Sequence, residues 1–102
     1  MKLEHESEKL LKEKILQILS RYLDLGEYRI FFFGSRVSGK SAVNSDIDVG
    51  IEGAKPLPFG VLSDIQDEIE ELPVLYKIDV VDFANANENF KAVAKEQIEL
   101  VN

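Results

Sequence analysis

Two aspartates, Asp46 and Asp48, are separated by a single residue in a segment, DIDVGIE, whose polar and apolar residues alternate. Such alternation is typical of a β-strand, in which side chains at i and i+2 share one face, with their Cα atoms roughly 7 Å apart. Two carboxylates that face one point can bind a divalent cation, and their hard oxygen ligands favour Mg²⁺ or Mn²⁺. The pattern therefore predicts a metal site, and a pair of ions about 3.5–4 Å apart would need a further carboxylate.

A third carboxylate is offered by the segment 75–83, LYKIDVVDF, which contains Asp79 and Asp82. The two aspartates are three positions apart, so they face opposite sides of a strand and only one of them can join the site. Asp79 lies inside an apolar run, where a carboxylate is costly to bury without a cation or hydrogen-bond donors. Asp82 is nearer the end of the strand and could simply be solvated. We therefore predict Asp79 as the third site residue.

The residues before the aspartates fit a nucleotide-binding motif that their context argues against. Residues 34–41, GSRVSGKS, match the P-loop pattern G-x-x-x-x-G-K-[ST] and follow an apolar run. In a P-loop, the Lys-Ser pair opens a helix whose N-terminus holds the phosphates. Here only Ala42 and Val43 separate Ser41 from the turn-like Asn44-Ser45-Asp46 and the next strand. A P-loop NTPase is therefore disfavoured.

Hydrophobic periodicity gives the elements that must position these residues. It predicts helices over 3–25, 59–72 and 88–101, strands over 28–33, 46–52 and 75–83, and a short helical turn within 35–42. Gly26 is expected to stop the first helix, and Asn87 to cap the last. The acidic residues of 59–72 are expected to form a solvated face. This order of elements predicts a small α/β (α+β) domain with helices packed on a short sheet.

Composition narrows the classes of function. The chain has 102 residues, the length of one domain (1–102), and a net charge of −7, which disfavours general nucleic-acid binding. It contains no cysteine, so disulfides and thiolate-metal sites are excluded. The N-terminus is too charged for a signal peptide, and no apolar run approaches the roughly 20 residues of a membrane span. We expect a cytoplasmic protein.

The spacing of the motif resembles a known signature. Gly34-Ser35, ten residues, then Asp46-x-Asp48 is similar to the signature of the DNA polymerase β-like nucleotidyltransferase superfamily. Arg36, Gly39, Ser45 and Ile47 resemble its minimal nucleotidyltransferase branch. The resemblance covers about residues 28–83 and implies the polymerase β-like fold, with a small mixed β-sheet.

This resemblance implies a reaction and roles for the residues. A nucleoside monophosphate, AMP from ATP, would pass to a hydroxyl on a partner HEPN-type protein, as in the antitoxin of a toxin–antitoxin pair. The residues implied to bind the nucleotide and its phosphates are Gly34, Ser35, Arg36, Lys40 and Ser45. The implied catalytic residues and ligands of two Mg²⁺ or Mn²⁺ ions are Asp46, Asp48 and Asp79.

Several alternatives remain open at this stage. Arg36 and Lys40 could equally be solvated loop charges. The chain could be a non-catalytic module that neutralises a partner by forming a complex with it. Transfer to a small molecule is a further alternative, although 102 residues are few for enclosing such a substrate.

Overall fold

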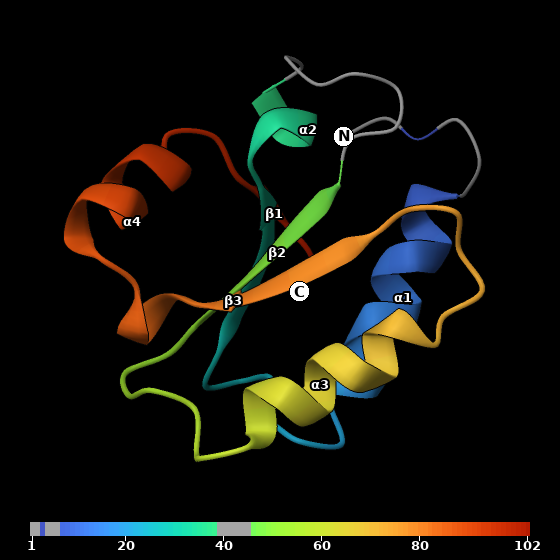
Figure 1. Cartoon of the computed structure of the whole chain (residues 1–102), viewed down its shortest axis with the longest axis horizontal. Coiled ribbons are helices and arrows are strands. Elements are labelled where there is room, and N and C mark those ends of the chain that lie inside the picture. Colours follow the sequence, from blue (N-terminus) through green and yellow to red (C-terminus); the bar gives the residue numbers. More distant parts are fainter. Residues whose placement is uncertain (1–2, 4–6, 39–45) are drawn as a thin grey trace.

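The fold consists of one four-stranded mixed sheet with helices on both faces (Figure 1). The computed structural model describes residues 3, 7–38 and 46–102. The elements, in chain order, are α1 (Glu8–Leu19), β1 (Arg29–Phe33), α2 (Ser35–Ser38), β2 (Ile47–Glu52), α3 (Val61–Glu70), β3 (Ile78–Asp82), the 3₁₀ turn η1 (Phe83–Asn85), α4 (Glu88–Ala94) and β4 (Glu99–Leu100). The predicted α/β class is confirmed.

The strands lie in the order β3-β2-β1-β4. β2 pairs parallel with β3, and β1 pairs antiparallel with both β2 and β4. Four of the five residues of β1 are buried, which confirms the burial on both faces that its apolar run predicts.

Each face of the sheet has its own apolar cluster. The larger cluster joins α1 and α3 to the sheet through residues such as Ile15, Ile65 and Val49. The smaller one, on the opposite face, consists of Phe31, Phe33 and Phe83, with the α4 residue Ala94 packed against it. Figure 1 accordingly shows α1 and α3 together and α4 apart from them. The polar face of β2 is therefore the face on which α4 lies.

The first helix is shorter than the predicted 3–25. It begins after Ser7, whose hydroxyl accepts the Leu10 N–H, and ends at Leu19, well before Gly26. The apolar periodicity continues because Leu23 stays buried beyond the helix end. α3 and β3 are likewise shorter at both ends than predicted.

The C-terminal prediction is partly wrong. Asn87 caps α4 as predicted, with its side chain accepting the N–H groups of Asn89 and Phe90. However, the helix ends at Ala94 instead of residue 101, and Glu99–Leu100 form the edge strand β4 beside β1. Asn102 extends this pairing, because its side chain accepts the Ile30 N–H.

The sequence predicted that the acidic face of α3 would be solvated, but one of its residues, Glu68, makes contacts within the fold. Glu68 accepts hydrogen bonds from the side chains of Arg21 and Tyr22, so it ties the turn after α1 to α3. These bonds hold the pKa of Glu68 below its usual value. No helix in the part of the chain that the structure describes is long and apolar enough to span a membrane.

Candidate active site

The sheet register brings two of the predicted carboxylates side by side. Asp48 on β2 is paired with Asp79 on β3, and neighbouring strands lie about 4.8 Å apart. The residues that flank them along each strand, such as Val49 and Val80, belong to the cluster under α1 and α3. Both carboxylates therefore point to the opposite face, as the alternation of residues predicts.

The electrostatics of Asp48 reflect this concentration of charge. Partial burial raises the pKa of Asp48, and the negative charges of Asp79 and Asp46 raise it further. Asp46 lies just before β2 and is exposed. The Lys77 ammonium lies 3.9 Å from the Asp79 carboxylate, at a largely exposed position. A cation bound at Asp48 would relieve the repulsion among these three carboxylates.

Gly34 forms the wall beside Asp48. It ends β1 with φ +83°, a left-handed conformation that favours glycine. A Cβ at this position would lie 2.4 Å from Asp48 Oδ2. The glycine therefore lets the turn from β1 into α2 pass directly against the carboxylate, and Ser35 follows as the first residue of α2.

Of the other residues predicted to lie near the phosphates, the structure describes only Arg36. Arg36 is buried, and its guanidinium carbon lies 4.6 Å from the centre of the Tyr76 ring, as in a cation–π contact. It is therefore not a solvated loop charge, and it ties α2 to the segment leading into β3. Lys40 and Ser45 lie outside the residues that the structure describes.

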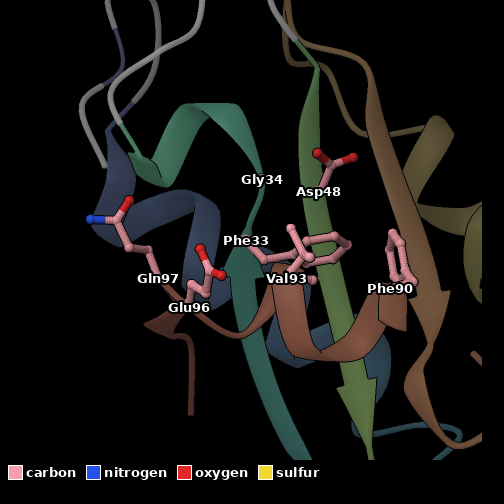
Figure 2. A pocket seen from close by; sticks show the side chains of 8 residues that line it. Phe33, Gly34, Asp48, Phe90, Val93, Glu96 and Gln97 are labelled. Atoms are coloured by element: carbon pink, nitrogen blue, oxygen red, sulfur yellow. The ribbon is translucent and has the colours of Figure 1, made fainter. Parts of the chain in front are cut away.

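A pocket of about 380 Å³ opens beside this centre. Its lining residues come from the end of β1, from β2, and from α4 and the residues after it: Phe33, Gly34, Asp48, Phe90, Val93, Ala94, Glu96 and Gln97. Figure 2 shows the Asp48 carboxylate above the Phe33 ring, with Glu96 and Gln97 on the far side of Val93. The pocket is thus charged at one side, apolar in the middle and polar again at the other side.

Asp82 has a structural role. It is buried, not solvated, and its carboxylate accepts the backbone N–H groups of Leu57 and Ala84. It thereby caps η1 and anchors the loop before α3. Asp82 is thus the N-cap of η1, and Asp79 is the β3 carboxylate that lies beside Asp48.

Sequence reasoning missed Gln66 on α3. Its side-chain amide donates to the Ile78 carbonyl at 2.8 Å and accepts the Val80 N–H at 2.9 Å. These two backbone groups flank Asp79 on the edge strand β3, so Gln66 holds the strand on both sides of that carboxylate. No local sequence signal reveals such a contact, because it joins a helix to a strand by side-chain reach alone.

The donor set suits a hard cation. Among residues 3, 7–38 and 46–102, no group of three or more His, Cys, Asp or Glu side chains is placed to hold a metal ion as it stands. Mg²⁺ nevertheless needs only one or two carboxylates, since water and substrate phosphates complete its coordination shell. The adjacent Asp48 and Asp79, with Asp46 nearby, fit that requirement.

The family follows from comparison with known proteins. The model of the family "Polymerase beta, Nucleotidyltransferase" matches residues 13–102, so the chain belongs to this family of nucleotidyltransferases. The "Probable protein adenylyltransferase MntA" of Haemophilus influenzae is 30% identical over 88 residues, which cover 84% of this chain and 77% of the relative. The resemblance to minimal nucleotidyltransferases is thereby confirmed.

Solved structures confirm the fold. A chain from the crystal structure of a toxin–antitoxin with AMP-PNP has a TM-score of 0.71 and 22% identity, covering 89% of this chain and 72% of its own. A chain from the complex of the tri-AMPylated Shewanella oneidensis HEPN toxin with its MNT antitoxin also has a TM-score of 0.71, with 18% identity and coverages of 94% and 72%. The polymerase β-like architecture inferred from the sequence is therefore correct.

Proposed function

We propose that this nucleotidyltransferase moves AMP from ATP to a side-chain hydroxyl of a partner HEPN-type protein and thereby acts as an antitoxin. The observation that carries the proposal is the pairing of Asp48 with Asp79, directly against the Gly34 turn. Similarity to a probable protein adenylyltransferase supports the choice of AMP, and similarity to a chain of the complex between a tri-AMPylated HEPN toxin and its MNT antitoxin supports the choice of partner. ATP is abundant in the cytoplasm, where we place the reaction.

In this proposal, Asp46, Asp48 and Asp79 hold two Mg²⁺ or Mn²⁺ ions. When bound, the ions supply neutralisation of the triphosphate and lower the pKa of the acceptor hydroxyl. The Gly34–Ser35 turn brings backbone close to the phosphates, because the glycine has no side chain to obstruct them. Arg36, Lys40 and Ser45 are assigned to the surroundings of the nucleotide. The contact with the Tyr76 ring holds the Arg36 guanidinium in place there.

The chemical step balances without an additional reactant. The acceptor hydroxyl oxygen attacks the α-phosphorus and forms the new phosphodiester bond. The bond from the α-phosphorus to the bridging oxygen of the β-phosphate breaks, and pyrophosphate leaves. The hydroxyl proton passes to a carboxylate on the acceptor side, for which Asp79 is our candidate because its side chain is 41% exposed.

Transfer of label from α-³²P-labelled ATP to a HEPN-type partner protein, sought among the products of the genes next to the one for this chain, tests the proposal. With Mg²⁺ present, the wild-type chain should label the partner, and Asp48→Asn and Asp79→Asn should not. Asp67→Asn, which changes an exposed carboxylate on α3, is the matched control and should label normally. Absence of labelling by the wild-type chain would refute the proposal.

The same variants distinguish catalysis from simple complex formation. If the chain neutralised its partner only by occlusion, Asp48→Asn would still inhibit the partner at a stoichiometric ratio. If the chain acts by AMP transfer, one wild-type molecule should inactivate many partner molecules, and inhibition by Asp48→Asn should be lost at substoichiometric ratios.

A further inference from the structure

Helix α4 leaves apolar side chains open to solvent beside the catalytic carboxylates. None of the residues of α4 is buried, and Phe90 and Val93 are 43% and 68% exposed. Both line the pocket that reaches Asp48. An exposed apolar surface that continues into a charged centre is typical of a binding site for a ligand with both characters.

The Phe90 ring is held as a fixed platform. It meets the Phe33 ring edge-on, with centroids 5.9 Å apart and planes at 88°, and it lies 5.7 Å from the Phe83 ring. These contacts fix the ring from the sheet side, and its exposed part faces the pocket. An aromatic ring held in this way can stack on a planar heterocycle, since every nucleobase offers a π-face.

The far side of the pocket is suited to reading a base edge. Glu96 and Gln97 line it just beyond α4, across the pocket from Asp48 (Figure 2). A carboxylate accepts N–H groups and repels carbonyl oxygens and phosphates, and an amide both donates and accepts. Glutamine recognises the amine and adjacent ring nitrogen of adenine, and a carboxylate accepts from an exocyclic amine.

We propose that this pocket is a nucleobase subsite, in which the base of the nucleoside triphosphate stacks on Phe90 and turns its exocyclic amine toward Glu96 and Gln97. Adenine, which carries an amine at C6, is therefore preferred over guanine, which carries a carbonyl oxygen at C6, and over uracil, which carries one at C4. The inference rests on the proposed function, because it takes the phosphates to lie at the Asp48 side. It adds the residues that select the base.

Binding of AMP-PNP and GMP-PNP to the full chain, measured by calorimetry with Mg²⁺, tests the stacking platform. Phe90→Ala should weaken AMP-PNP binding about 5- to 150-fold, the range measured for loss of one base–aromatic stack. Phe90→Tyr, which keeps the ring, should bind as the wild type does. Phe59→Ala removes a fully exposed phenylalanine from the loop before α3 and should leave affinity unchanged.

Base selection is tested by the ratio of the two affinities. Glu96→Gln should tighten GMP-PNP relative to AMP-PNP, because the new amide can donate to the guanine carbonyl. Glu71→Gln, at an exposed position after α3, is the matched control and should keep the wild-type ratio. An unchanged ratio in Glu96→Gln would overturn the assignment of base selection.

The outcomes separate this inference from the proposed function. If the wild-type chain labels its partner normally and both Phe90→Ala and Phe90→Tyr keep the wild-type affinity for AMP-PNP, the subsite is refuted and the proposed function stands. If Phe90→Ala weakens partner binding and leaves nucleotide affinity intact, α4 is a protein-docking face and the subsite is refuted. If AMP-PNP binding depends on the Phe90 ring but no AMP is transferred, the subsite stands and the proposed function fails.

Discussion

Replacing Gly34 with alanine tests whether the turn and the Asp48 carboxylate form one unit. The new Cβ would lie 2.4 Å from Asp48 Oδ2, so the carboxylate must retreat by about 0.6 Å to reach even 3.0 Å, a spacing below which real Cβ contacts are essentially not found. Catalytic groups have to stay within about 0.5 Å of their productive geometry, and a 1 Å displacement can lower a rate about 100-fold. We therefore expect AMP transfer by Gly34→Ala to fall about 10- to 100-fold.

A second glycine separates this displacement from backbone strain. Gly60, before α3, has φ +82°, almost the same as the +83° of Gly34, but an added Cβ there meets nothing within 4 Å. Both alanine variants should therefore lose about 1–2 kcal/mol of folding free energy to the left-handed conformation. Only Gly34→Ala should lose transfer beyond what its stability explains.

Urea unfolding and label transfer, measured on both variants at a temperature where each is folded, give the comparison. A domain of this size has about 5–15 kcal/mol of stability, so both variants should remain folded. Equal transfer rates for Gly34→Ala and Gly60→Ala would refute the argument that the turn positions Asp48.

Two further perturbations address the carboxylates themselves. Burial and the neighbouring carboxylates raise the pKa of Asp48 in the folded chain, so its ionisation destabilises the fold as pH rises above the unfolded-state value. In EDTA, Asp48→Asn should therefore gain stability over the wild type between pH 4 and pH 7 in urea unfolding. Mg²⁺ at 100 times its dissociation constant should stabilise the wild type by about 2.7 kcal/mol and the variant less. Gln66→Met removes the two hydrogen bonds that flank Asp79. It should lower the free energy of unfolding by about 1–3 kcal/mol and raise the Mg²⁺ concentration needed for transfer. Gln17→Met, at an exposed position of α1, is the control and should do neither. A wild-type Mg²⁺ requirement in Gln66→Met would contradict the positioning role.

The parts of the site that the sequence predicted are those that depend on strand periodicity. Alternation through β2 placed Asp48 on the face opposite Val49, and the three-residue separation of Asp79 and Asp82 required them to part. Both inferences need only the two-residue repeat of a strand, which is a local property. The Asn87 cap is local in the same sense, because the N–H groups that donate to its side chain lie within three residues.

The elements that the sequence did not reveal depend on distant partners. β4 has two residues, and its pairing with β1 joins positions that lie almost 70 residues apart, as Phe31 with Leu100. The apolar residues on either side of β4, Ile98 and Val101, continue the helical spacing of α4, so periodicity alone assigned this segment to the helix. The contact of Arg36 with Tyr76 and the bonds of Gln66 to β3 likewise arise only once the sheet has formed.

The register across three strands is what makes this small domain a candidate enzyme. Phe33 is paired with Asp48, and Asp48 with Asp79, so one row across the sheet carries both carboxylates. Because β1 runs antiparallel to β2, it ends where β2 begins, and Gly34 emerges at the start of that row. A slip of one residue in β2 would turn Asp48 into the apolar cluster beneath α1 and α3 and bring Val49 to the site. The apolar residues under the two large helices thus fix the position of the proposed catalytic carboxylates, and a separate binding domain is not needed to bring them together.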